Sequence, residues 1–175
     1  MTILIFTEGT VLMHALAKGV SREERVKQSQ AAVIQRILPF RASPGSVYDL
    51  ENYIPVHNAV EKIKKWKKQG VTIFYLSSRR VKKEIEAIRS ILQKYDFPDF
   101  QNLLYRQQGE DYKDVAERLM PDIFIEDDCE SIGGEKEMTY TYMSNDAKEK
   151  VHSIIVKEFS GIDHLPDNLG QLKTH

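Results

Sequence analysis

The chain has 175 residues, with 25 lysines and arginines against 26 aspartates and glutamates, so its net charge is close to zero. This length fits one domain with a sizeable core, and the balanced charge gives no overall field to attract a nucleic acid polymer or an anionic membrane. The first residues lack both the basic leader of a signal peptide and the length of a membrane span, so we expect a cytoplasmic protein.

The amino-terminal third combines a strand pattern with a different, helical pattern. Residues 2–6 are a compact apolar run, which is typical of a buried strand, and Gly9 follows among polar residues, where a glycine permits a sharp turn close to a ligand. Residues 21–24 have the sequence of a helix capping box, and apolar residues then recur at helical spacing up to Leu38. Residues 41–46 predict a loop. We interpret about residues 14–54 as a small helical cap insertion over the site, because it is too short to hold its own core.

The rest of the chain alternates between helical and strand patterns. We expect Pro55 to open a helix that ends at Gly70, and a later helix to end near Tyr95. The tail after Pro166 is expected to be frayed. The remaining expected elements are strands over residues 71–76, 102–105, 121–126 and 151–159, and a short helix over residues 111–119. This alternation predicts a single three-layer α/β domain over residues 1–175, Rossmann-like, with a parallel five-stranded sheet and helices on both faces.

The fourth expected strand ends in three consecutive carboxylates, Glu126, Asp127 and Asp128. Ligands of open α/β sheets bind beyond the carboxyl ends of the strands, so these acids lie where a site is expected. Their mutual repulsion is relieved by a cation, by protonation of one acid or by a nearby lysine or arginine. Mg²⁺, which prefers oxygen ligands, is the expected cation. A solvated acidic turn is the alternative interpretation. The neighbouring Cys129, the only cysteine, is expected to be an unreactive packing residue, because nearby negative charge raises the pKa of a thiol.

Other strand ends bring hydroxyls and cations to the same edge of the sheet. Hydroxyl, amine and guanidinium groups bind phosphoryl oxygens, so a phosphate site is predicted beside the metal. Arg106, after the third strand, could also reach this edge. The predicted phosphate-binding residues are Thr7, Gly9, Thr10, Ser77, Ser78, Arg79, Arg80 and Lys113, and the predicted acid/base is Glu8.

In order and spacing these residues resemble the motifs of the haloacid dehalogenase-like (HAD-like) superfamily. The resemblance covers residues 3–11, residues 73–77, Lys113 and residues 123–128, which are similar to that family's D-x-D-G-T, Ser/Thr, Lys and acidic-pair motifs. It implies a Mg²⁺-dependent phosphohydrolase fold with a cap at the position of the insertion.

The sequence departs from the family pattern at the nucleophile. The resemblance places Glu8 at the family's acid/base aspartate and Phe6 at its nucleophilic aspartate. A phenyl ring cannot attack phosphorus or bind Mg²⁺, so covalent aspartyl-phosphate chemistry is not expected here.

Three functions remain open at this stage. The chain binds a phosphorylated small molecule or nucleotide with Mg²⁺ and without turnover, or it is a phosphohydrolase in which Mg²⁺ activates water and Glu8 is the base, or it is an interaction module on an inherited fold. Uncompensated charges facing one another argue against the third function, an idle site. Of the other two we favour binding without turnover, while the family resemblance implies descent from a hydrolase. The sequence leaves ligand identity and oligomeric state open.

Overall fold

The computed structural model describes residues 1–34 and 49–175, and of residues 32–34 it describes the backbone alone. Five strands form one sheet in the order β5-β4-β1-β6-β7, and every neighbouring pair is parallel. These strands are β1 (Thr2–Phe6), β4 (Thr72–Leu76), β5 (Leu103–Leu104), β6 (Ile123–Asp127) and β7 (His152–Val156). Because all run in one direction, their carboxyl ends share one edge. The predicted α/β fold with a parallel five-stranded sheet is confirmed.

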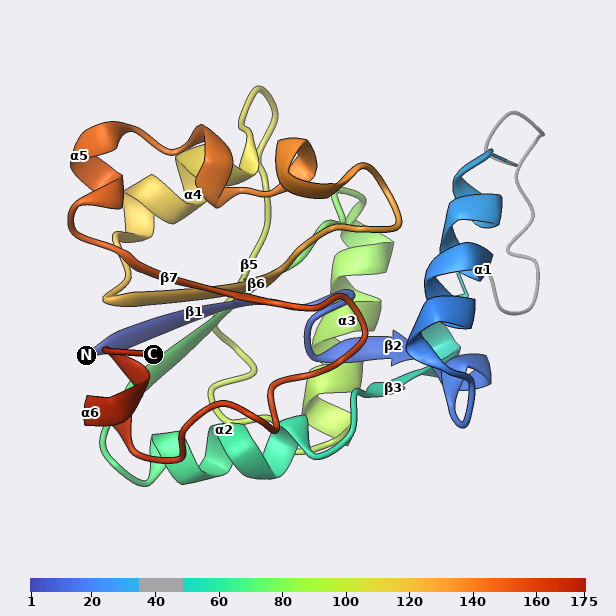
Figure 1. Cartoon of the computed structure of the whole chain (residues 1–175), viewed down its shortest axis with the longest axis horizontal. Coiled ribbons are helices and arrows are strands. Elements are labelled where there is room, and N and C mark those ends of the chain that lie inside the picture. Colours follow the sequence, from blue (N-terminus) through green and yellow to red (C-terminus); the bar gives the residue numbers. More distant parts are fainter. Residues whose placement is uncertain (35–48) are drawn as a thin grey trace.

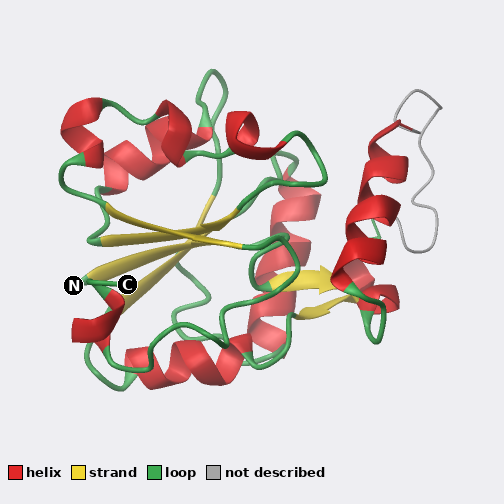
Figure 2. Ribbon diagram, viewed as in Figure 1, coloured by secondary structure: helices red, strands yellow, loops and turns green. Residues whose placement is uncertain are grey.

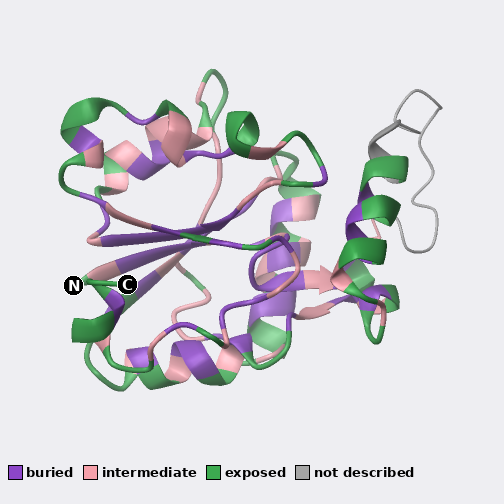
Figure 3. Ribbon diagram, viewed as in Figure 1, coloured by how far each residue is buried: buried purple, intermediate pink, exposed green. Residues whose placement is uncertain are grey.

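Helices cover both faces of this sheet, as Figures 1 and 2 show. Side chains alternate between the two faces of a strand, so Ile3 and Ile5 of β1 join one core cluster and Leu4 joins the other. Trp66 packs in the first cluster and Val115 in the second. The helices of the first face are α2 (Ala59–Lys67), α3 (Lys82–Lys94) and α6 (Leu169–Leu172), and those of the second are α4 (Tyr112–Leu119) and α5 (Asn145–Lys148). Figure 3 shows the strands buried between these two layers.

The helices form where the sequence combines capping residues with an apolar face. α3 buries Ile85, Ile88, Ile91 and Leu92 on one side, at the spacing that predicted it. α4 starts at a reciprocal capping box, in which the Asp111 amide donates to the Asp114 carboxylate at 2.7 Å. Single helical turns occur at η1 (Ala15–Ala17), η3 (Leu50–Asn52), η4 (Gly134–Glu137) and η5 (Tyr140–Tyr142). No helix in the described ranges is both long and apolar enough to cross a membrane.

A second, small structural unit lies beyond the carboxyl edge of the sheet (Figure 1). β2 (Leu12–His14) and β3 (Tyr53–Pro55) form an antiparallel pair, and α1 (Arg22–Ile34) lies between them in the chain. The Glu24 amide donates to Ser21 Oγ at 3.2 Å, as the capping-box pattern predicts. The expected continuation of this helix to Leu38 and the loop at 41–46 fall outside the described residues. The extent of the insertion, about residues 14–54, stays a prediction.

Two expectations were wrong, one about the start of a helix and one about the carboxyl-terminal tail. Pro55 closes β3 instead of opening a helix, because a short edge strand tolerates a residue without an amide hydrogen, and α2 starts at Ala59. The tail beyond Pro166 is not frayed. The Pro166 carbonyl oxygen accepts a hydrogen bond from Trp66 Nε1 at 2.9 Å, and Leu172 of α6 is fully buried.

Candidate functional site

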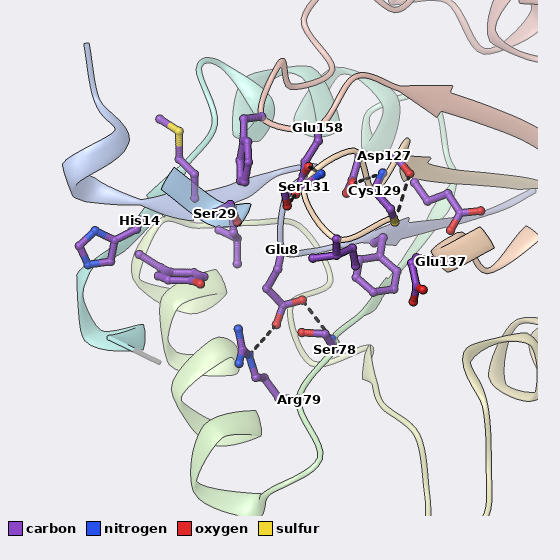
Figure 4. Close-up of a pocket in the computed structure, with 18 of the residues that line it drawn as sticks. Glu8, His14, Ser29, Ser78, Arg79, Asp127, Cys129, Ser131, Glu137 and Glu158 are labelled. Atoms are coloured by element: carbon purple, nitrogen blue, oxygen red, sulfur yellow. Dashed lines mark hydrogen bonds and ion pairs between the residues drawn. The ribbon is translucent and has the colours of Figure 1, made fainter. Parts of the chain in front are cut away.

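A cavity of about 490 Å³ opens at the carboxyl edge of the sheet, and residues of α1, β2 and β3 also contribute to its wall (Figure 4). Thr7, Thr10 and Ser77 are fully buried behind this wall. Of the predicted site residues, those that line the cavity are Glu8, Gly9, Ser78, Arg79, Arg80, Glu126 and Asp127. The structure therefore brings most of the predicted set to one place.

Donors from two strand ends surround the Glu8 carboxylate. The Ser77 hydroxyl and Arg79 Nε donate to Oε1 at 2.7 and 3.3 Å, and the Thr7 hydroxyl and the Ser78 amide donate to Oε2 at 2.5 and 3.1 Å. Figure 4 shows Glu8 turned toward Arg79 and Ser78. A carboxylate has about four lone-pair sites, so these four donors fill its acceptor capacity. Glu8 thus ties the end of β1 to the end of β4.

The wall around Phe6 is aromatic and cationic. The Phe6 ring packs edge-on against Tyr112, with ring centroids 5.3 Å apart. The guanidinium carbon of Arg106 lies over the Tyr112 ring, 3.6 Å from its centroid, and Arg106 donates to the Tyr112 hydroxyl at 2.8 Å. All three residues line the cavity. The phenyl ring of Phe6 offers this wall no atom that can act as a nucleophile or a metal ligand.

Three carboxylates at the strand ends form a group that could hold a metal ion. Asp127, Asp128 and Glu158 each offer one oxygen, and these oxygens lie within 4.8 Å of one another. Asp127 accepts hydrogen bonds from the Thr10 hydroxyl at 2.8 Å and the Cys129 amide at 3.0 Å, and burial raises its pKa to about 7. Oxygen donors at this spacing fit a hard divalent cation such as Mg²⁺.

Glu126, the third predicted ligand, does not join this group. The backbone amides of Thr139 and Tyr140 each donate to its carboxylate at 2.8 Å, and burial raises its pKa. It anchors the chain that follows β6. Glu158 stands in the group instead, two residues after β7 ends, and its amide donates to Asp128 Oδ1 at 3.0 Å. The strand-end rule, applied to the fifth strand, would have found it. The identity of the metal ligands stays a prediction.

Of the described residues, Cys129 lines the cavity and Lys113 does not. In the described part of the chain the cavity wall includes Tyr112 but not Lys113, which is half-buried one position along α4, and its role in phosphate binding stays a prediction. Sequence reasoning missed Tyr112. Burial, and then the charge of Asp127, raises the pKa of the Cys129 thiol, in the expected direction, and its lack of reactivity stays a prediction.

The backbone beside the acidic group is strained. Cys129 and Phe159 have φ angles of 50° and 63°, which non-glycine residues adopt at a cost on the order of 1 kcal/mol or more. The Phe159 amide donates to the Gly9 carbonyl at 2.7 Å, so the loop after β7 is fixed to the turn after β1. Gly9 itself has φ 89°, and a Cβ there would lie 2.7 Å from Asp127 Oδ2. This close packing keeps Asp127 and Glu158 in place.

Comparisons with known proteins place the fold. No family model and no curated protein matches the sequence. A structure of the class C acid phosphatase from Bacillus anthracis is 16% identical, with a TM-score of 0.52, over 91% of this chain and 67% of that chain. The same enzyme with tungstate bound is 16% identical, with a TM-score of 0.50, over 91% and 68%. A HAD family hydrolase from Deinococcus radiodurans R1, with bound phosphate and sodium, is 10% identical over 91% of both chains, with a TM-score of 0.44. The chain therefore shares the fold of class C acid phosphatases.

Proposed function

We propose that this chain is a HAD-like protein that binds a phosphorylated small molecule or nucleotide together with Mg²⁺, without forming an aspartyl-phosphate. The cavity supports this proposal because its wall carries both guanidinium groups and carboxylates, among them Asp127 and Glu158. Arg79, Arg80 and Arg106 are suited to phosphoryl oxygens. The residues suited to the metal are Asp127, Asp128 and Glu158. Bound Mg²⁺ would supply positive charge that offsets both the carboxylates and the ligand phosphate.

The observation that carries the proposal is the state of Phe6 and Glu8. Phe6 has no lone pair with which to attack phosphorus, and its ring is packed against Tyr112. Four donors contact the Glu8 carboxylate, so accepting a proton from water or substrate would require one of these hydrogen bonds to break. Both positions that the family resemblance assigns to chemistry are thus engaged in packing or hydrogen bonding.

A phosphohydrolase that uses metal-activated water is the second candidate. The spacing of the carboxylate oxygens of Asp127, Asp128 and Glu158 favours it, since a metal held there could also lower the pKa of a bound water. In this function Glu8 would be the base, and to accept a proton it would have to give up one of its four hydrogen bonds.

Thermal denaturation with Mg²⁺ and a panel of phosphorylated metabolites and nucleotides tests the proposal. A ligand that binds the native state alone raises the melting temperature by mass action. We expect Mg²⁺-dependent stabilisation of the native protein and its loss in Asp127→Asn. Asp146→Asn, the same change at an exposed position of α5, should keep it. The absence of any shift in the native protein would contradict the proposal.

A further inference from the structure

Arg25 of α1 is a buried cation on the wall of the cavity. It is 7% exposed and lines the same cavity as Glu8 and Asp127. Among the described residues its Nε has no hydrogen-bond partner and no carboxylate forms an ion pair with it, while Nη1 makes a 3.4 Å contact with Gln28 Oε1. Residues 32–48 contain no aspartate or glutamate, so the remainder of the chain supplies no carboxylate either.

The burial of an unpaired guanidinium is unfavourable. Desolvation of an uncompensated charge is unfavourable, and here it lowers the pKa of Arg25. The Phe159 ring, 5.2 Å from the guanidinium carbon, offsets part of this cost through a cation–π contact. A guanidinium has five N–H donors in a fixed fork, and an anion in the cavity would satisfy those that the protein leaves free.

Arg25 lies near the cationic side of the cavity but on a different element. Arg25, Arg79 and Tyr53 of β3 all line this cavity, and the charges of both guanidinium groups act on the Tyr53 phenol. The charge of Glu158 also acts on Arg25. Mg²⁺ bound by the acidic group would engage Glu158 and leave Arg25 to the ligand.

We infer that Arg25 forms a second anion subsite, so that the preferred ligand carries a second anionic group, a carboxylate or another phosphoryl group, besides the phosphate at Arg79 and Arg80. The inference rests on the proposed function, because both use one cavity. It narrows the ligand class to phosphorylated compounds with two separated anionic groups.

Calorimetric titrations at fixed free Mg²⁺ test this preference. Ethyl phosphate has one anionic group, while phosphoglycolate adds a carboxylate and ethylene glycol bisphosphate adds a phosphoryl group. We expect at least one of the two-anion ligands to bind the native protein about tenfold or more tightly than ethyl phosphate. The stronger of the two identifies the second group.

Matched variants assign the preference to Arg25. Arg25→Gln should abolish it, and Arg25→Lys, which keeps the charge but not the fork, should retain part of it. Lys27→Gln, a loss of the same charge at an exposed position of the same helix, should leave it unchanged. Equal affinity of the native protein for all three ligands, or a preference that survives in Arg25→Gln, would overturn the inference while leaving the proposed function intact.

Failure of all three ligands to bind would count against the proposed function, and sulfate then tests the subsite by itself. Here the melting temperatures of the native protein and Arg25→Gln are compared as sulfate is added. A rise that is larger in the native protein supports an anion subsite, whereas identical rises, which reflect only the general effect of sulfate, overturn it.

Discussion

Glu8 acts in this structure as a hydrogen-bond acceptor that holds two strand ends together, and this role can be separated from that of a base. In Glu8→Gln an amide replaces one oxygen, so N–H groups would face the Ser77 hydroxyl or the Ser78 amide. We expect the free energy of unfolding in urea to fall by about 2 kcal/mol, the typical value of hydrogen bonds to a charged group. Ligand binding should weaken with it.

Glu84→Gln is the control for this substitution, since Glu84 lines the same cavity and receives none of these hydrogen bonds. Its stability should match that of the native protein. If Glu8→Gln instead kept full stability and removed a measurable turnover of phosphate esters, Glu8 would be a base and not an anchor.

Gly9 offers a second test at the scale of single residues, because its contact with Asp127 can be separated from its backbone conformation. Gly9 and Gly70 have φ angles of 89° and 88°, so an alanine at either pays a similar cost on the order of 1 kcal/mol. An added Cβ at Gly9 would meet Asp127 Oδ2 at 2.7 Å, whereas at Gly70 it would meet nothing within 4 Å.

We therefore expect Gly9→Ala and Gly70→Ala to lower the melting temperature, but only Gly9→Ala to lose the stabilisation by Mg²⁺. Titration of both variants with Mg²⁺ measures this. Equal responses to Mg²⁺ would mean that the position of Asp127 does not matter for the metal.

At the scale of elements, the sequence predicts what depends on local patterns. The buried strands and the amphipathic helix α3 follow from apolar runs and helical spacing. α5 and α6 are four residues long, and β2 and β3 three residues each, too short for any period to show. The order of polar groups at the strand ends could be predicted, because parallel strands share one carboxyl edge.

The partners of those polar groups could not be predicted from local patterns. Glu8 and Ser77 are 69 residues apart in the chain, and the hydrogen bonds of Glu126 depend on the start of η5, a single helical turn that follows a loop. Arg25 is a single charged residue on a helix with other charged residues, so only its burial distinguishes it. Local patterns thus predicted which strand ends meet, but not which groups on them are already satisfied.

Strand β3 joins the small unit around α1 to the cavity through Tyr53. The contribution of this residue to the free energy of unfolding depends on pH. Burial raises the pKa of Tyr53 from 10.0 to about 12. The unfolded chain therefore loses this phenolic proton first as pH rises. The contribution of Tyr53 to stability is fully present below pH 10 and is lost between pH 10 and 12.

Urea unfolding of the native protein and Tyr53→Phe across this range measures the effect. Between pH 9 and pH 12 the native protein should lose about 2 kcal/mol of unfolding free energy relative to Tyr53→Phe. Tyr75, whose pKa burial also raises, is present in both proteins and cancels. Parallel pH profiles would contradict the burial of the Tyr53 hydroxyl.

At the scale of the whole molecule, the parallel sheet brings the ends of separate strands to one cavity. Glu8 and Arg79 lie on one part of its wall, and Asp127 and Glu158 on another (Figure 4). The unit that contains α1 adds Arg25 from outside the sheet. Under the proposed function these charges bind a phosphorylated ligand and a metal, and Phe6 occupies the position that the family resemblance assigns to the nucleophile.

Phosphate release measured on a ligand that raises the melting temperature in the presence of Mg²⁺ tests this account most directly. The account predicts that the native protein binds the ligand and releases no inorganic phosphate above the rate of Asp127→Asn. Release by the native protein that disappears in Asp127→Asn and persists in Asp146→Asn would contradict it and identify a hydrolase that uses metal-activated water.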